Sequence, residues 1–445
     1  MKKNIVLLSV TVAVVAVALW MYADRTSIKN PVLDLRPRGG NANGSAEYLN
    51  AQKAVQYYRD EIRRTPDVVK NYVELAQIFL QESRVTANHH EYVPKAQYLL
   101  REALSRDPNN FEALVTNASL SMTLHRFAEA RELAQKGLSI NPYNASCYNT
   151  LVDALVELGE YDQAVMACDK LMSIHPDLRG YARVSYLREL HGDLDGAIDA
   201  MKMAADAGMP GQEQRAWTLY NLANLFLHEG KLDTAEFIYR GILEERPHYA
   251  YALSGLAQVR MAQRRHDEAI QLFNEALETT PEHIFMEELS DLYQSVGQDD
   301  NAGKIAKLVL QSFEQHNKDG WNTDREYALF CASHNIDLPE ALQRARKEYD
   351  RRPKNIDALQ TYAWLLYKNG HAGDAISYIE DAMRLNTKNA LLEYRAGLIH
   401  KAADRPREAA KHLQEALTID PFISGLYADD ARRTLESMNA LAVNN

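Results

Sequence analysis

The chain has 445 residues, a formal net charge of −11 and a pI of about 5.7. This length is too great for one compact core, and it is ordinary for two or three domains or for one long array of repeats. The acidic balance argues against a nucleic-acid partner, because proteins that follow a phosphate backbone usually carry a basic patch.

The chain opens with MKK and continues as an uncharged apolar run over residues 4–23. A run of about 20 residues is long enough to cross a bilayer as a helix, and Trp20 and Tyr22 stand at its far end, as interfacial aromatic residues do. These features predict a bacterial protein with one transmembrane helix in the inner membrane and the remainder in the periplasm. The alternative is a cleaved signal peptide, with a small-x-small site at residues 16–18, and a soluble periplasmic product. An inverted topology with a cytoplasmic array also stays open.

Residues 24–45 hold two prolines and three glycines and show little periodicity. Such composition predicts a flexible linker between the apolar run and the folded part of the chain. A single helix is expected next, near residues 46–64. It precedes the first full repeat.

Proline recurs at a fixed interval through the rest of the chain. Pro108, Pro142 and Pro176 are 34 residues apart, and so are Pro247 and Pro281. Between them lie alanine-rich segments with a helical apolar period and a turn near the middle. A period of 34 residues with this pattern indicates stacked helix hairpins. Each hairpin leaves an apolar face bare, so only stacking on a neighbour completes the core.

The segment 250–283 shows the pattern most clearly, with Leu256 and Ala257 in its first helix and Ala269 and Phe273 in its second. These residues resemble the tetratricopeptide repeat family, whose motif sets small residues at the helix crossing and proline after the second helix. The resemblance implies an all-α solenoid, a right-handed superhelix of about ten hairpins over residues 46–440. The expected repeats are 69–110, 111–144, 145–178, 179–212, 216–249, 250–283, 284–320, 322–355, 356–389 and 390–423, with a capping helix at 426–440.

The pattern departs from its period in several places. An insertion of about eight residues is expected around residues 82–95. A Gly/Pro loop lies at 208–211 and a polar loop at 316–320. In the repeat that starts at Ile356, Thr387 stands where the motif has proline.

The resemblance also implies where a partner would bind. In this family, residues of the first helix that lie outside the core line the concave face. Aromatic and amide side chains there suit an extended peptide, because rings supply contact area and amides pair with peptide backbone. The alternative is that the rings only fill gaps between hairpins. The candidate groove residues are Asn149, Asp153, Trp217, Tyr220, Asn224, Tyr251, Gln258, Trp364, Tyr367 and Tyr394, with Glu157 beside them.

The three cysteines, Cys147, Cys168 and Cys331, show neither a CxxC motif nor Cys/His metal spacing. Cys147 and Cys168 fall on the two helices of one expected repeat, which leaves open either a disulfide or two small core residues. No glycine-rich phosphate loop, GxSxG motif or triad spacing occurs. The sequence therefore predicts a protein that is not an enzyme and has no cofactor and no metal site.

The predicted function is a non-catalytic interaction scaffold at the membrane. It would bind peptide segments of an envelope or membrane complex in its concave groove and help to assemble or stabilise that complex. The alternative is a ligand- or peptide-responsive regulatory subunit that signals to a membrane partner. The motif itself is structural, so it is specific for the fold and weak for the function.

Overall fold

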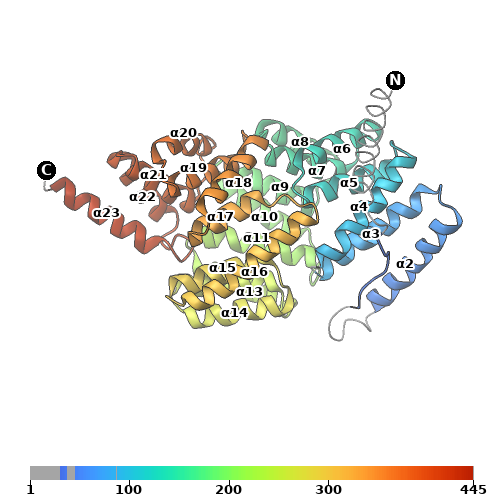
Figure 1. Cartoon of the computed structure of the whole chain (residues 1–445), viewed down its shortest axis with the longest axis horizontal. Helices are drawn as coiled ribbons and strands as arrows, with labels where there is room; N and C mark the ends of the chain where they lie inside the picture. Colours follow the sequence, from blue (N-terminus) through green and yellow to red (C-terminus); the bar gives the residue numbers. More distant parts are fainter. Residues whose placement is uncertain (1–30, 38–45, 87, 444–445) are drawn as a thin grey trace, which may run out of the picture. The chain divides into compact units, whose positions relative to one another are not determined.

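The computed structural model describes residues 31–37, 46–86 and 88–443 of the chain (Figure 1). These residues hold 22 α-helices and no strand, and the helices pack as successive hairpins. The prediction of an all-α solenoid is confirmed. The chain divides after Asn110 into two compact units, which are taken here one at a time.

The first unit contains helix α2 (Ala46–Arg64) and the hairpin of α3 (Val69–Thr86) and α4 (His89–Arg106). Phe79 and Tyr92 stack between the two helices of the hairpin with ring centroids 6.0 Å apart, and both are buried. Most of the insertion expected around residues 82–95 is helical. Residues 82–86 belong to α3 and residues 89–95 to α4, and each helix is 18 residues long.

Residues 31–37, part of the expected linker, lie against the helices of the same unit. The buried Lys95 ammonium donates to the Asp34 carbonyl oxygen at 2.6 Å and to Glu91 Oε1 at 2.6 Å. The Arg36 backbone N–H donates to the Tyr92 hydroxyl at 3.1 Å. Buried polar groups of this kind are retained only where they are bonded, so this segment has a defined position on α4.

The second unit is built of nine hairpins and a last helix. In order they are α5 (Phe111–Thr123) with α6 (Phe127–Ile140), α7 (Ala145–Glu157) with α8 (Tyr161–Ile174), α9 (Leu178–Leu190) with α10 (Leu194–Asp206), α11 (Glu213–His228) with α12 (Leu232–Glu245), α13 (Ala250–Ala262) with α14 (His266–Thr279), α15 (His283–Ser295) with α16 (Asp299–Lys318), α17 (Asp324–His334) with α18 (Leu338–Arg351), α19 (Ile356–Lys368) with α20 (Ala372–Ala382), α21 (Ala390–Ala402) with α22 (Pro406–Ile419), and α23 (Ala428–Val443).

Small residues let the two helices of a hairpin approach closely. In α13 and α14, Ala257, Ala269 and Ala276 are completely buried, and Phe273 fills the space between the helices. Gly255 lies directly against the Tyr239 ring of the preceding hairpin, where a Cβ would overlap the ring. The motif therefore works by steric fit within and between neighbouring hairpins.

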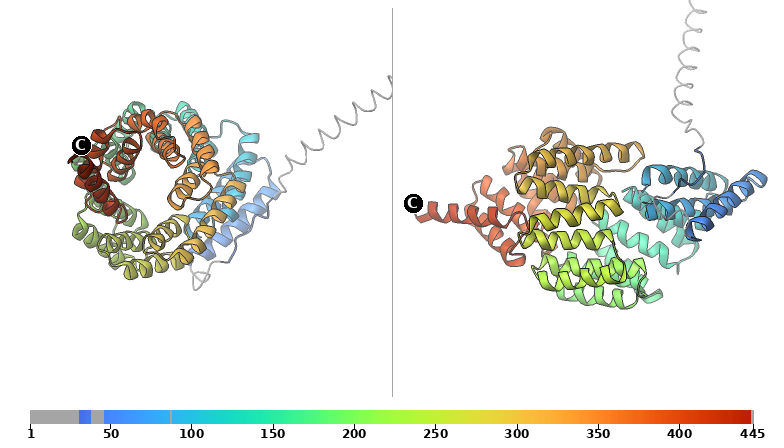
Figure 2. Two further views of the ribbon diagram at one scale, coloured as in Figure 1. Left: turned by 60° about the vertical axis from the view of Figure 1, so that its left-hand side comes forward. Right: turned by 90° about the horizontal axis from the view of Figure 1, so that it is seen from below.

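The first helices of the hairpins form the inner layer of this unit. Successive first helices contact one another, such as α7 with α9 and α17 with α19, whereas no two second helices in the described residues are comparably close. A curved array brings its inner helices together and spreads its outer ones. In the left view of Figure 2, the hairpins of residues 111–419 follow one another round a ring.

Hairpins far apart in the sequence meet along a line of contacts that we call the seam. For the first four hairpins of the unit, the turn between the two helices contacts the loop that lies five hairpins further on, so that the turn of the first hairpin contacts the loop after the sixth. The turn of the fifth hairpin contacts the start of α23. The paired segments are 124–126 with 320–322, 156–161 with 352–356, 190–192 with 386–387, 230 with 421, and 262–264 with 425–429.

The strongest polar contact of the seam centres on Arg352, whose side chain is only 5% exposed. Its guanidinium lies 2.5 Å from Glu157 Oε2 and 2.5 Å from Glu348 Oε1, and it donates to the Glu157 carbonyl oxygen at 3.1 Å. Beside it, the Ile356 backbone N–H donates to the Tyr161 hydroxyl at 3.0 Å. Two carboxylates thus neutralise one buried guanidinium.

Further along the seam, the contacts involve backbone groups and apolar side chains. Thr387 Oγ1 donates to the Leu190 carbonyl oxygen at 2.5 Å, and the Asn322 backbone N–H donates to the Leu124 carbonyl oxygen at 3.1 Å. Ile356 and Leu385 join the apolar cluster formed by α7, α8 and α9. The seam therefore combines hydrogen bonds with the packing of apolar side chains.

Glycine makes the closest approach of the seam possible. Gly159, in the turn between α7 and α8, has a φ of +75°, and a Cβ there would overlap the backbone of Lys354 and Asn355. Gly370, in the turn between α19 and α20, has a φ of +84°, and no atom outside its own turn would lie within 4 Å of its Cβ. The two glycines have the same left-handed backbone conformation, but only Gly159 packs against a distant part of the chain.

The predicted single-pass location in a bacterial inner membrane is contradicted. No helix in the described part of the chain combines the length and the apolar character needed to cross a bilayer. The apolar run at residues 4–23, on which both the anchor and the signal-peptide predictions rested, lies outside the described residues.

Candidate functional site

The candidate site is the inner face of the second unit, where first helices carry the predicted groove residues. Asn149 and Asp153 lie on α7; Trp217, Tyr220 and Asn224 on α11; Tyr251 and Gln258 on α13; Trp364 and Tyr367 on α19; and Tyr394 on α21. The structure separates them into groups with different surroundings.

The aromatic residues of α11 and α13 form one continuous cluster. The Tyr220 ring lies 5.5 Å from Tyr251 and 6.2 Å from Tyr239, and the Tyr251 ring lies 5.3 Å from Phe285. Asn224 accepts a hydrogen bond from the Tyr239 hydroxyl at 2.5 Å. These rings fill the gaps between hairpins, as the alternative interpretation had it. Trp217 differs, because 41% of its surface is exposed.

On α7, the predicted residues are partnered by the next hairpin. Asp153 Oδ2 lies 2.5 Å from Arg183 Nη2, and Arg183 Nε donates to the Asn149 carbonyl oxygen at 3.2 Å. The Asn149 side chain is buried, and its Oδ1 accepts no hydrogen bond from the described residues. A partner protein therefore has to displace Arg183 in order to bind Asp153.

On α19, Trp364 and Tyr367 stack with ring centroids 5.0 Å apart. The Arg395 guanidinium lies 5.4 Å from the Trp364 ring centroid, and the Lys368 ammonium lies 5.9 Å from it. Tyr394, predicted in the same groove, is buried and donates to Asp430 Oδ2 of α23 at 2.7 Å. Trp364 is thus flanked by cations, whereas Tyr394 is tied to the last helix.

A cavity of about 250 Å³ lies on the inner face beside these residues, and we call it the α15 cavity. Its polar walls are Gln258, Glu287, Glu288, Asp291, Ser333, Arg395, Ser424 and Tyr427, and its apolar walls are Met261, Leu329, Phe330, Leu391 and Leu426. These residues come from α13, α15, α17, α21 and the loop before α23. Of them, the sequence analysis named only Gln258.

Three carboxylates converge on the α15 cavity. Glu288 accepts hydrogen bonds from Ser254 Oγ at 2.6 Å and from Gln258 Nε2 at 2.7 Å. Asp291 Oδ1 lies 3.0 Å from Nε2 of His334, whose ring is buried. Glu287 Oε1 lies 3.8 Å from Nε2 of the His283 ring, which carries a charge only when it is protonated, and no Lys or Arg among the described residues forms an ion pair with Glu287. Glu287 is therefore the carboxylate with the weakest compensation.

The surroundings disfavour the charged forms of two of these groups. Burial raises the pKa of Glu288 to about 7, even though the Ser254 and Gln258 hydrogen bonds act in the opposite direction. Burial, and after it the charge of Asp291, raises the pKa of Glu287 well above its usual range. Both pKa shifts follow mainly from burial, and the nearby charge of Asp291 adds to them.

The sequence did contain a signal for this cavity. Asp291 stands eight residues after the start of α15, as Gln258 does in α13 and Trp364 in α19. The rule that selected Gln258 and Trp364 would therefore have selected Asp291. The contribution of Leu426 and Tyr427 had no such signal, because they belong to the loop beyond the last full hairpin.

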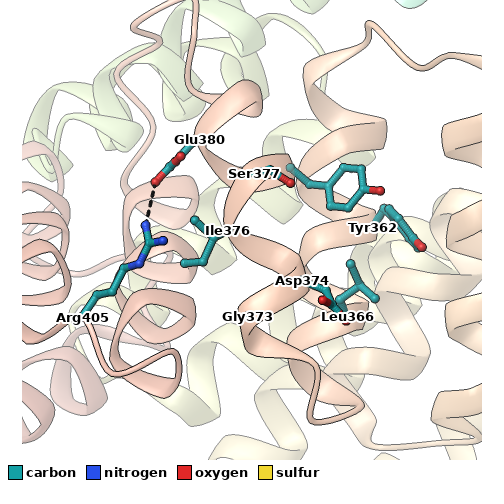
Figure 3. A pocket seen from close by; sticks show the side chains of 9 residues that line it. Tyr362, Leu366, Gly373, Asp374, Ile376, Ser377, Glu380 and Arg405 are labelled. Atoms are coloured by element: carbon teal, nitrogen blue, oxygen red, sulfur yellow. Dashed lines mark hydrogen bonds and ion pairs between the residues drawn. The ribbon is translucent and has the colours of Figure 1, made fainter.

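A second, wider hollow lies on the α20 side of the hairpin of α19 and α20, with a volume of about 660 Å³. Figure 3 shows Arg405 and Glu380 pointing toward one another at one side, with Tyr362 and Leu366 at the other. Arg405 Nη1 and Glu380 Oε1 are 3.2 Å apart, and both side chains are about half exposed. An exposed pair of this kind contributes little to binding or stability, so we take the α15 cavity as the better site.

The described residues contain no group of three or more His, Cys, Asp or Glu side chains placed to hold a metal ion. Cys147, Cys168 and Cys331 are buried and unbridged, and burial raises the pKa of each thiol to about 11. Such thiols stay protonated at neutral pH and are poor nucleophiles.

Relatives with curated descriptions match only parts of the chain. It is 24% identical over 186 residues to cellulose synthase operon protein C of Pseudomonas fluorescens, covering 39% of this chain and 14% of the relative. It is 24% identical over 226 residues to cellulose synthase 1 operon protein C of Komagataeibacter xylinus, covering 51% of this chain and 15% of the relative. The chain therefore spans about a seventh of the length of these relatives.

Solved structures with similar folds are also helical repeat proteins. A tetratricopeptide repeat protein of Thermus thermophilus is 22% identical, with 43% of this chain and 98% of that one covered and a TM-score of 0.38. One from Parabacteroides merdae is 18% identical, with 59% and 98% covered and a TM-score of 0.35.

Family models supply the assignment. Models described as tetratricopeptide repeat match residues 121–188, 226–284 and 362–422. Each of these ranges falls in the second unit, where successive hairpins with small residues at their crossings have just been described. This chain belongs to the tetratricopeptide repeat family.

Proposed function

We propose that this protein is a non-catalytic scaffold that binds an extended segment of a partner protein along the inner face of residues 111–445. Proteins of this family generally mediate contacts between proteins. The proposal rests on two tryptophans of the first helices on that face. Trp217 is exposed, and Trp364 is flanked by cations. Partly exposed aromatic side chains are frequent anchors of protein interfaces.

The scaffold would hold partner segments during the assembly or stabilisation of a complex. The sequence analysis placed that complex in an envelope because of the apolar run at residues 4–23 alone. Since the inner-membrane location is contradicted, the proposal names a protein partner and no compartment.

The seam favours a fixed scaffold over the alternative of a flexing regulatory subunit. A change in curvature would have to break the contacts of Arg352 and Thr387 across the seam. Breaking a buried ion pair is costly, because it leaves a charge without a partner. The inner face is therefore held in one shape before a partner arrives, which lowers the entropy cost of binding.

The test is site-specific photo-crosslinking in cells that make the full chain. A photoreactive phenylalanine analogue replaces Trp217 or Trp364 on the inner face, or Phe237 as the control. Phe237 lies on the second helix α12 and is 78% exposed, so it reports contacts made by the outer layer. We expect both inner positions to capture the same partner and Phe237 to capture none of it.

Two outcomes would contradict the scaffold. One is capture of the partner from Phe237 alone. The other is undiminished capture by the analogue placed at Tyr367 of α19 after Trp217→Ala and Trp364→Ala are combined in a protein with unchanged helix content by circular dichroism.

A further inference from the structure

We propose that the α15 cavity receives a lysine or arginine side chain of the partner segment. This inference rests on the proposed function, because it names a residue type in the partner that lies on the same inner face. The argument uses the shape of the cavity, its charge, and the way in which its last wall is held in place.

The shape suits a side chain with an aliphatic stem. Met261, Leu329, Leu391 and Leu426 supply apolar walls, and the carboxylates of α15 supply the polar one. A lysine or arginine buries its methylene groups against apolar surface while its charged head seeks oxygen partners. The volume of about 250 Å³ lies below the range of roughly 300–1,000 Å³ that is usual for drug-sized ligands.

The charge of the cavity calls for a cation. Glu287, Glu288 and Asp291 face one guanidinium, that of Arg395, which already lies over the Trp364 ring. Glu288 accepts two hydrogen bonds from neutral groups and Asp291 lies beside the His334 ring, whereas no described residue donates a hydrogen bond to Glu287. An incoming ammonium or guanidinium would supply the missing donor and the missing charge together.

The last wall of the cavity is a built feature and not a chance gap. The loop before α23 carries Leu426 and Tyr427, and three successive residues in it, Ile423, Ser424 and Gly425, have φ values of 45°, 58° and 70°. Asp420 holds this conformation by accepting hydrogen bonds from the Phe422 and Ser424 N–H groups at 2.9 Å each. The backbone thus stays in a region that costs energy for side-chain-bearing residues, and it does so where it closes the cavity.

The charge preference can be measured without a partner. In the full chain, Ser333→Cys places a thiol in the cavity wall, and Ser139→Cys on the exposed face of α6 is the control. We would compare the rates of modification by a cationic thiosulfonate, with an ethylammonium group, and by its anionic sulfonate counterpart. A site of one charge sign raises the local concentration of the opposite ion by about 10-fold or more.

The expected result is a cation-to-anion rate ratio about 10-fold higher at Ser333→Cys than at Ser139→Cys. Adding Glu287→Gln and Asp291→Asn together should bring the ratio close to that of the control, whereas adding Glu314→Gln, an exposed carboxylate on α16, should leave it unchanged. Equal ratios at the two cysteines would overturn the proposal. This readout does not use the partner, so its failure is distinct from a failure of the crosslinking test.

A protection assay then separates a partner side chain from a free amine. The probes are two capped seven-residue peptides of serine, glycine and tyrosine that differ only in a central lysine or norleucine, together with n-butylamine. We expect the lysine peptide to slow modification of Ser333→Cys at concentrations where the norleucine peptide and n-butylamine do not. Equal protection by norleucine would show that the carboxylates are not used, and equal protection by n-butylamine would assign the cavity to a free amine; either result overturns the proposal.

Discussion

Gly159 and Gly370 occupy the same place in their hairpins, yet they teach different things about the array. Both stand in the turn between two helices, with φ values of +75° and +84°. Around Gly159 the backbone of Lys354 and Asn355 leaves no room for a side chain, whereas the space around Gly370 is open. The turn at Gly370 thus requires glycine only for its local conformation. The turn at Gly159 requires it for tertiary packing as well.

The largest expected effect tests whether the seam is a true interface. Arg352→Ala removes the buried guanidinium between Glu157 and Glu348, so Glu157 loses its ion-pair partner and Glu348 keeps only Arg351. We expect the free energy of unfolding to fall by about 3–5 kcal/mol, as for other broken buried pairs. Arg405→Ala, which breaks a half-exposed pair outside the seam, should cost less than about 1 kcal/mol. Urea titration followed by circular dichroism gives both values, and similar losses would mean that the seam is not formed in solution.

The second prediction addresses the two glycines directly. Gly370→Ala should lose about 1–2 kcal/mol, because alanine is strained in the left-handed region. Gly159→Ala should lose about 1–3 kcal/mol more, because its Cβ also displaces the backbone across the seam. The same urea titrations measure the difference between the two variants. Equal losses of stability in the two variants would show that Gly159 is required only by the conformation of its own turn.

The third prediction contrasts the charges of the seam with those of the α15 cavity. Burial raises the pKa of Glu288 to about 7, so the folded state binds more protons than the unfolded state between the usual glutamate pKa and about pH 7. Glu288 therefore weakens folding progressively as the pH rises through that window. Glu288→Gln should remove this trend, so its stabilising effect should be about 2–3 kcal/mol larger at pH 8 than at pH 5.

Glu348 in the seam should behave in the opposite way. Burial acts to raise its pKa, but Arg352 and the hydrogen bonds from Asn322 and Arg351 outweigh burial and lower it. Its contribution to stability is thus complete above the ordinary glutamate pKa and is lost only as the pH falls through the lower folded value. Glu348→Gln should cost the same at pH 5 and pH 8 in unfolding experiments. A gain from Glu288→Gln that does not grow with pH would contradict the contrast.

The smallest effects are expected from single contacts of the seam. Thr387→Val removes the hydroxyl that donates to the Leu190 carbonyl oxygen and should cost about 1 kcal/mol. Thr418→Val removes a similar bond to Gln414 within one exposed helix and should change stability by less than that. Thermal unfolding of the two variants under one set of conditions is sufficient. A larger loss for Thr418→Val would indicate that Thr387 lies outside any packed interface.

The sequence predicted the hairpins because their causes are local. Small residues at the crossings and prolines after most second helices recur within 34 residues, so the pattern is visible in the sequence alone. The seam joins residues 194–199 positions apart in most of its polar contacts, and no period marks such pairs. The one visible trace was Thr387 in place of proline, whose hydroxyl now has a partner across the seam.

The groove was predictable only in part, and the reasons differ from residue to residue. Trp217 and Trp364 are on the inner face because a helix period places them there. Tyr394 follows the same period, yet it is buried, because α23 covers it and Asp430 accepts its hydroxyl hydrogen. The carboxylates of α15 line a cavity because the loop after the last full hairpin forms its remaining wall.

The seam also limits how such an array is able to lengthen over evolution. Tandem repeats commonly gain or lose whole units by duplication, since each unit contacts only its neighbours. Here a unit added between Gly159 and Asn355 would move every later loop by one hairpin and bring the wrong backbone against each glycine turn. Duplications outside the joined segments leave the pairing intact. The number of hairpins between the two sides of the seam is therefore fixed, although the motif alone would permit any number.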